Sequence, residues 1–137
     1  MNKFSEMHIR VFRFVYIPFV FMLLSGCVTV EQQMIDDGYK PVTTQELNEL
    51  FSKPVNMRWT LRNMEQGNVE LDPDKNAKIT HAGGIDYGTW AAENDRLCIS
   101  WDRFRGGGKE CNTLFKIGEN KFKVVPPDKL DFIVTIE

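Results

Sequence analysis

Histidine and cysteine are scarce in this chain, which has two His and three Cys among its 137 residues. These side chains supply most metal sites and many catalytic nucleophiles, so the sequence leaves little room for either. A strong charge of one sign is also missing, because 17 Lys and Arg stand against 19 Asp and Glu. Nucleic-acid binding needs a basic face, so no nucleic-acid partner is expected. The length supports one compact domain.

The N-terminal segment differs from the rest of the chain. Met1–Arg13 carries three bases and one acid, and Phe14–Leu24 is an uncharged apolar run of eleven residues. Such a run fits the core of a signal peptide and is well short of the ~20 residues that a permanent membrane-spanning helix needs. The tetrapeptide Leu24-Ser25-Gly26-Cys27 follows directly and resembles the lipobox of bacterial lipoprotein precursors.

This resemblance implies a processing route and a membrane partner. Residues 1–26 would be a signal peptide that is removed before Cys27, and the Cys27 thiol would be the lipid attachment site. In enteric bacteria an Asp after the lipidated cysteine retains a lipoprotein in the inner membrane. Val28 at that place therefore indicates, by analogy, the periplasmic face of the outer membrane. A buried cysteine after a short core helix is the alternative.

The mature chain from Cys27 onward has 14 bases and 18 acids and keeps one histidine, His81. Residues 27–42 show no sustained period and are expected to be a lipidated N-terminus and linker, whose last fifteen residues would reach about 50 Å when extended. A short helix is predicted at about residues 44–51. Thr43 and Glu46 form a capping box before it, and an apolar stripe follows.

Period-two alternation begins at residue 55, where Val, Met, Trp and Leu alternate with polar residues up to Leu61. Further short strands between turns are expected at 68–71, 77–81, 86–92, 96–101, 110–117, 121–125 and 130–136. Seven or eight such strands predict a mainly β antiparallel meander that closes into a small calycin- or lipocalin-like barrel spanning residues 43–137. An open curved sheet is the alternative. Trp59, Trp90 and Trp101 would fill so small a barrel, so no large cavity is expected.

Cys98 and Cys111 lie in successive strand candidates on either side of one loop. In an exported chain this placement predicts a disulfide bond between them. Two buried free thiols or a redox pair are the alternatives.

No catalytic residue, metal site or cofactor is predicted. His81 alone cannot form a two-histidine metal site, and its surroundings match no motif for a catalytic base. The run Asp72-x-Asp74-x-Asn76 resembles the first half of a calcium-binding EF-hand loop. Ala77 and Gly83 then replace the glycine and the glutamate that such a loop requires, so a polar hairpin turn is the better interpretation.

The loop at residues 102–109 is glycine-rich and basic, but it lacks the spacing of a phosphate-binding loop. Arg103, Phe104, Arg105 and Lys109 form a candidate partner-binding tip for an envelope protein or an anionic glycan or lipid. A flexible hairpin tip without a partner is the alternative.

The mature domain also resembles a family of small exported bacterial β-domains of unknown function. The shared motifs are the run from Gly38 through Thr43, Glu46 and Leu47 to Phe51, then the turn Pro73-Asp74, Gly88-Thr89-Trp90, Arg96-Leu97-Cys98-x-x-Trp101 and Cys111. The chain departs from the family's pattern at Lys75 and at residues 52–55. It implies a fold and paired cysteines, and it brings no catalytic residues.

Together these features predict a lipid-anchored, periplasm-facing protein of the cell envelope that acts as a binding or structural module. An inhibitor of an envelope-directed hydrolase, such as a lysozyme or a protease, is the alternative. That role would require a protruding loop, for which Arg103–Lys109 is the candidate. An enzyme is the least expected function.

Overall fold

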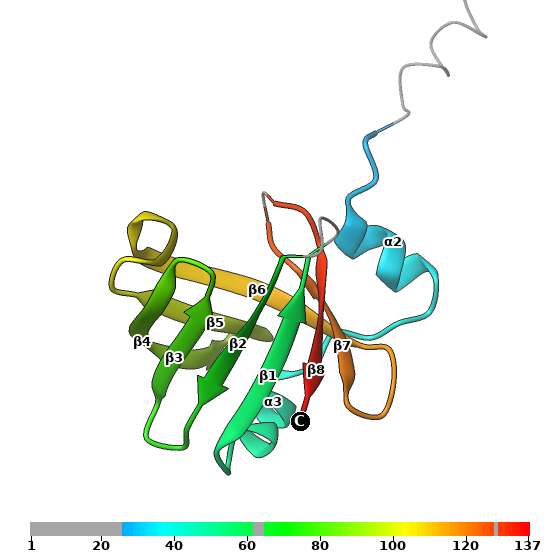
Figure 1. The fold of residues 1–137 in the computed structure, drawn as a ribbon. Helices are drawn as coiled ribbons and strands as arrows, with labels where there is room; N and C mark the ends of the chain where they lie inside the picture. The colour runs from blue at the N-terminus through cyan, green and yellow to red at the C-terminus, as the bar shows by residue number, and fades with distance from the viewer. Residues whose placement is uncertain (1–25, 62–64, 128) are drawn as a thin grey trace, which may run out of the picture.

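A computed structural model describes residues 26–61, 65–127 and 129–137. In this part of the chain eight strands form a closed antiparallel barrel, in which each strand pairs with the next and the last pairs with the first (Figure 1). The strands are β1 (Val55–Thr60), β2 (Gln66–Leu71), β3 (Asn76–His81), β4 (Gly84–Glu93), β5 (Arg96–Trp101), β6 (Gly108–Lys116), β7 (Lys121–Val125) and β8 (Phe132–Ile136). The predicted small barrel is confirmed, and the open sheet is not observed. The signal peptide, with Leu24 and Ser25 of the lipobox, lies outside the described residues.

Alternation along the strands builds the interior of the barrel. In β1, Met57 and Trp59 are buried, whereas Arg58 and Thr60 are exposed. Trp59 lies opposite Gly67 of β2, and a Cβ atom at Gly67 would come within 2.5 Å of the Trp59 ring. The large indole therefore occupies the space that the missing side chain leaves on the neighbouring strand.

Gly88 of β4 allows the close backbone approach that its position in a strand predicts. A Cβ atom there would lie 2.1 Å from the carbonyl oxygen of Ser100 on β5. Only glycine permits two strands to approach this closely.

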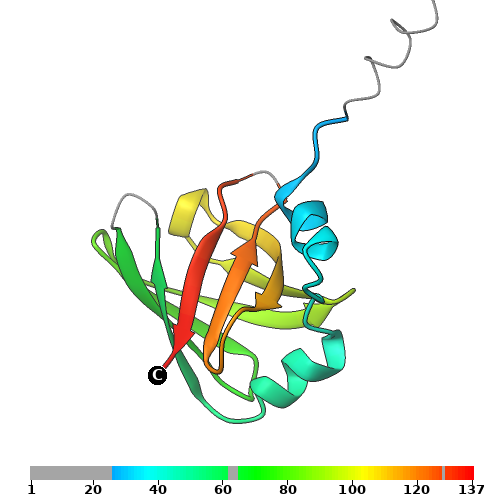
Figure 2. The same ribbon diagram turned by 90° about the vertical axis from the view of Figure 1, so that its right-hand side faces the viewer.

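The helix α3 (Thr44–Leu50) packs against one end of the barrel (Figure 2). Its N-terminus has the predicted capping box, in which the Thr43 N–H donates to the Glu46 carboxylate and the Glu46 N–H donates to the Thr43 hydroxyl. Leu47 and the C-cap residue Phe51 are buried, and Phe51 packs edge-on against Trp90 with ring centres 5.2 Å apart. The predicted helix at 44–51 is thus confirmed, and docking on the barrel supplies the stability that two isolated turns lack.

A second helix, α2 (Val30–Asp36), lies within residues 27–42, the segment expected to be a lipidated N-terminus and linker. Thr29 caps its N-terminus by accepting a hydrogen bond from the Gln32 N–H. Gly38, with φ at +89°, ends the helix, since this left-handed conformation lets the next N–H groups bond back to the last turn. The chain is therefore helical, and not extended, between Val30 and Asp36.

The helix α2 is attached to the outer face of the barrel. Met34 is buried against Phe115 of β6 and Val125 of β7, on the side of the sheet opposite the barrel interior. After the helix, the Val42 N–H donates to the Leu114 carbonyl at 2.8 Å, so the chain continues along β6. Consecutive residues of β6 therefore serve two cores: Leu114 faces the barrel interior and Phe115 faces α2.

The predicted disulfide bond joins Cys98 of β5 to Cys111 of β6, which are direct partners in the strand register. Cys98 is buried. The bond closes a loop with a sequence separation of 13 residues, so it restricts the unfolded chain as well as fixing the hairpin.

Replacing both cysteines by alanine (Cys98→Ala/Cys111→Ala) is expected to lower the free energy of unfolding by about 3 kcal/mol, the chain-entropy value for a loop of this size. Denaturant titration measures the change. A reductant should destabilise the wild type by a similar amount, should add about 2 Da to its mass, and should leave the variant unaffected. A wild type that is equally stable with and without reductant contradicts the prediction.

Candidate functional site

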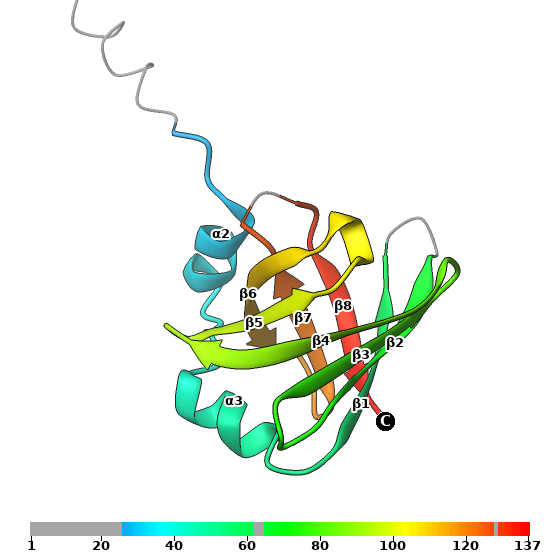
Figure 3. The ribbon, with the colours of Figure 1, turned by 90° about the vertical axis from the view of Figure 1, so that its left-hand side faces the viewer.

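The two ends of the barrel are built differently (Figures 1 and 3). Whereas α3 packs against one end, the opposite end opens onto a cavity of about 80 Å³. The residues around this opening, which we call the mouth, are Leu61, Phe104, Arg105, Glu110, Asn112 and Phe132. The cavity is far smaller than the ~300 Å³ at the lower end of small-molecule pockets, as expected for a barrel that its own side chains fill.

The loop between β5 and β6 folds back across the mouth. It contains the short 3₁₀ helix η2 (Phe104–Gly106), in which Arg105 has φ at +53° and ψ at +35°. The three following glycines have φ at +87°, +76° and +100°. Four successive left-handed residues reverse the chain, which explains the glycine run because other residues rarely adopt this conformation. We call residues 103–107 the cap.

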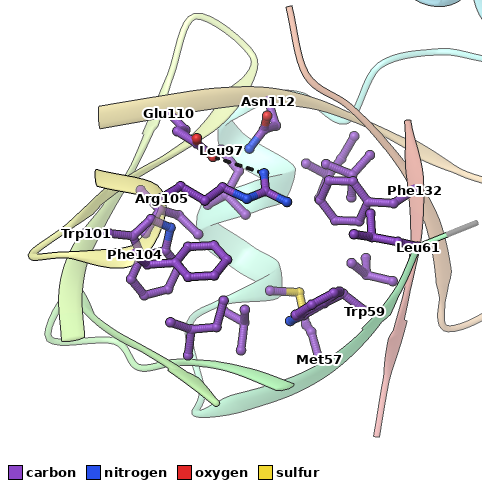
Figure 4. A pocket seen from close by; sticks show the side chains of 16 residues that line it. Met57, Trp59, Leu61, Leu97, Trp101, Phe104, Arg105, Glu110, Asn112 and Phe132 are labelled. Carbon is purple, nitrogen blue, oxygen red and sulfur yellow. Dashed lines mark ion pairs between the residues drawn. The ribbon is translucent and has the colours of Figure 1, made fainter. Parts of the chain in front are cut away.

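Phe104 anchors the cap in an aromatic cluster at the mouth (Figure 4). Its ring meets Trp101 edge-on with centres 5.9 Å apart and lies tilted against His81 at 4.8 Å. The His81 Nδ1 accepts a hydrogen bond from the Gly83 N–H at 3.0 Å. This arrangement gives His81 a structural position beside the cap.

Asp86 of β4 holds the backbone of the cap. Its carboxylate accepts hydrogen bonds from the N–H groups of Arg103 at 2.8 Å and Phe104 at 2.6 Å. Asp86 is only 3% exposed, and the Arg103 Nε lies 3.6 Å from its second oxygen. The hydrogen bond from the Arg103 backbone, with that from Phe104, lowers the pKa of the Asp86 carboxyl because both stabilise its charged form.

Asp86 was not among the site residues predicted from the sequence, although a signal was present. In β4 the buried Asp86 lies between the exposed residues Ile85 and Tyr87. The inward-facing side of the strand is therefore polar at this point, whereas Trp90 on the same side further along is apolar. An inward-facing Asp in such a strand requires a partner, because an unpaired buried charge is costly. That partner is a pair of backbone N–H groups, which no residue pattern reveals.

Arg105 extends its guanidinium across the mouth (Figure 4). Its Nη1 lies 3.9 Å from Glu110 on β6, and its charge also lies 5.2 Å from the Phe104 ring centre. Glu110 has a second partner in the Lys129 ammonium. Arg105 is the one base among the residues described around the cavity, and Glu110 is the one acid.

The four residues predicted to form one partner-binding tip are not brought together. Phe104 and Arg105 turn into the mouth, whereas the Arg103 side chain is 83% exposed. Strand alternation directs Lys109 to the outer face of the barrel, where its ammonium bonds Glu93 of β4 at 2.6 Å. The cap therefore contributes two residues to the cavity and one exposed base to its rim.

The EF-hand-like run is a hairpin turn, as predicted. The Asp72 carboxylate accepts hydrogen bonds from the side chain and the backbone N–H of Asn76, which lower the pKa of the Asp72 carboxyl. Lys75 reverses the chain with φ at +70°. In the described part of the chain no three His, Cys, Asp or Glu residues gather in a group that would hold a metal ion.

Cys27 is exposed and carries a free thiol, two positions before the residue that caps α2. Of the described helices, none has the length and apolar character needed to cross a bilayer. The structure thus leaves the thiol at the predicted lipid attachment site accessible.

Comparison of the chain with protein-family models, curated proteins and solved structures found no match. The fold and the site together define the class: a small closed β-barrel with one end packed by a helix and a capped mouth at the other. Such a fold is consistent with a binding module that has no enzymatic activity.

Replacing Asp86 by asparagine is expected to lower the melting temperature at neutral pH, because the cap loses a charged acceptor for two N–H groups. A lowered pKa stabilises the fold above the unfolded value of about 3.9, and this contribution is lost as the pH falls through the folded pKa. The wild type should therefore lose stability more steeply than Asp86→Asn below about pH 4. Thermal melts from pH 3 to 7 measure this. Asp74→Asn, in an exposed turn, is the control, and parallel curves for wild type and Asp86→Asn contradict the prediction.

Proposed function

We propose that the protein is a lipid-anchored lipoprotein of the cell envelope that acts as a binding module, with the capped mouth as its ligand site. The observation that carries this proposal is the guanidinium of Arg105 held over an apolar cavity. An apolar pocket with one convergent charged group selects a ligand with an apolar body and a group of opposite charge. The favoured ligand is therefore a small apolar carboxylate.

The ion pair at the mouth suits exchange with such a ligand. The Arg105 side chain is 35% exposed, and its separation of 3.9 Å from Glu110 is long for a charged hydrogen bond. A ligand carboxylate can engage the guanidinium with two parallel hydrogen bonds. Glu110 would then keep Lys129 as its partner, so ligand binding leaves no unpaired acid at the mouth.

The cavity must enlarge to take such a ligand, because about 80 Å³ holds only a few carbon atoms. Phe104 is the aromatic cap residue at the opening, and a rotation of its side chain out of the cluster with Trp101 and His81 would widen the entrance. The cap backbone can stay in place during this rotation, since Asp86 binds the N–H groups of the cap and not its side chains.

The proposed location follows from the lipobox and from the exposed thiol of Cys27. Processing at this box would leave the barrel on the periplasmic face of the envelope, with Val28 favouring the outer membrane. The hydrolase-inhibitor alternative required a protruding loop. Because Phe104 and Arg105 turn into the mouth, the described geometry favours the binding module.

Replacing Arg105 by glutamine is expected to weaken octanoate binding by about 10- to 100-fold, the range for losing a charge-assisted hydrogen bond. Octanol, which has the same chain without the charge, should bind both proteins equally. Quenching of the fluorescence of Trp59 and Trp101, which line the cavity, reports binding. The matched control is Arg103→Gln, an exposed base of the same cap. Unchanged octanoate affinity in Arg105→Gln, or no saturable binding to the wild type, refutes the ligand site.

Replacing Cys27 by serine is expected to abolish incorporation of labelled palmitate and to release the protein from the membrane fraction, because serine lacks the thiol that accepts diacylglycerol. Metabolic labelling followed by fractionation measures both. Cys98→Ala/Cys111→Ala, which keeps Cys27, is the matched control and should stay labelled. Persistent labelling of Cys27→Ser would show that the lipid is attached elsewhere.

A further inference from the structure

We propose that the mouth end of the barrel rests on the bilayer that holds the lipid anchor, so that the ligand site opens toward membrane lipids. The partner surface is the headgroup region of that same membrane. This inference rests on the proposed lipid attachment at Cys27. It goes further because it assigns an orientation and a docking surface to the folded domain.

The first support is the length of chain between the anchor and the fold. Only three residue steps separate Cys27 from Val30, the first residue of α2, and they span about 10 Å when extended. An anchored Cys27 would therefore hold the beginning of α2 close to the headgroups. A free linker up to residue 42 would have allowed about five times that distance.

The second support is the attachment of α2 to the barrel, which transmits this constraint to the whole domain. Met34 is buried between α2 and the outer face of the barrel. Glu31 in the first turn accepts a hydrogen bond from the Thr113 hydroxyl at 3.2 Å and lies 3.7 Å from Arg96. Apolar and polar contacts thus fix both turns of the helix, and the barrel cannot swing freely on its tether.

The third support is direction. In an antiparallel barrel alternate connections lie at the same end, so the loops after β3, β5 and β7 share the mouth end. Figures 1, 2 and 3 show the chain from residue 26 approaching α2 from this end, whereas α3 and the C-terminus lie at the opposite end. The tether therefore draws the mouth, and not α3, toward the membrane.

The fourth support is the chemistry of the mouth end. Three large hydrophobic residues are exposed there: Val28 at 66%, Ile85 at 49% and Leu130 at 71%. Lys129 adjoins Leu130 in the sequence, and Arg103 lines the same surface hollow as Ile85. Apolar side chains that enter the interface, flanked by bases that reach the headgroups, are typical of membrane-contacting surfaces.

The opposite end carries two exposed tyrosines on its flanks, Tyr39 beside Lys116 and Tyr87 beside Asp72. Its three turns contain Asp72-Pro73-Asp74-Lys75, Asn94-Asp95 and Gly118-Glu119-Asn120, and none of the large exposed hydrophobics falls in them. This contrast between the two ends provides a matched control for an experiment.

The test uses the full lipidated protein in vesicles of phosphatidylethanolamine and phosphatidylglycerol. A single cysteine labelled with an environment-sensitive fluorophore is placed at the mouth end in Leu130→Cys or Ile85→Cys, and at the opposite end in Asp74→Cys. The other cysteines would not react, because Cys27 would carry lipid and Cys98 is bonded to Cys111. Nitroxide-labelled lipids should quench both mouth labels at least threefold more than the label at position 74, and the mouth labels should shift to the blue.

The outcomes separate this inference from the proposed anchor. Equal quenching at the two ends, with palmitate still incorporated, overturns the docking surface and leaves the lipoprotein assignment standing. Stronger quenching at position 74 reverses the orientation and overturns the docking surface as well. Failure of the wild type to incorporate palmitate overturns both proposals.

Discussion

The capped mouth depends on one carboxylate, because Asp86 is the buried group that binds the backbone of the cap to the barrel wall. Its two hydrogen bonds fix the N–H groups of Arg103 and Phe104. This sets the direction in which the side chains of Phe104 and Arg105 leave the loop. Phe104 then enters the aromatic cluster with Trp101, and Arg105 crosses the cavity. A charged acceptor suits this role, since hydrogen bonds to a carboxylate are stronger than those to a neutral group.

Closure of the barrel explains why its outer face is available for packing against another element. Eight strands pair in a circle, so no sheet edge has to be protected. The outer face is then free to carry further structure, and β6 uses it: Leu114 belongs to the barrel interior while Phe115 lies under α2. The helix α2, which precedes the barrel strands in the chain, is in this way part of the folded domain.

The strands and α3 were predictable because each leaves a local pattern. Period-two alternation marks a strand with one buried face, and Thr43 with Glu46 marks a helix start. The helix α2 was missed since Met34 is its only buried residue and gives no apolar stripe, although Thr29 and Gly38 provide start and stop signals. The site was harder to predict, because Asp86 and its partners lie 17 and 18 residues apart and are joined through backbone atoms.

The glycine run shows how a sequence can be read in two opposite ways. Three successive glycines suggest a flexible tip, because glycine has the widest conformational freedom. In the structure the same freedom permits the left-handed conformations that fold the cap inward, so the glycines shape the loop. The contacts of the neighbouring residues decide between these interpretations: the backbone of Arg103 and Phe104 is bonded to Asp86, which fixes the loop. With Asp86 holding the backbone and the Phe104 ring packed against Trp101 and His81, both backbone and side-chain contacts fix the cap at the mouth. Under the proposed function, ligand entry would require the Phe104 ring to leave this cluster, while the backbone bonds to Asp86 stay in place.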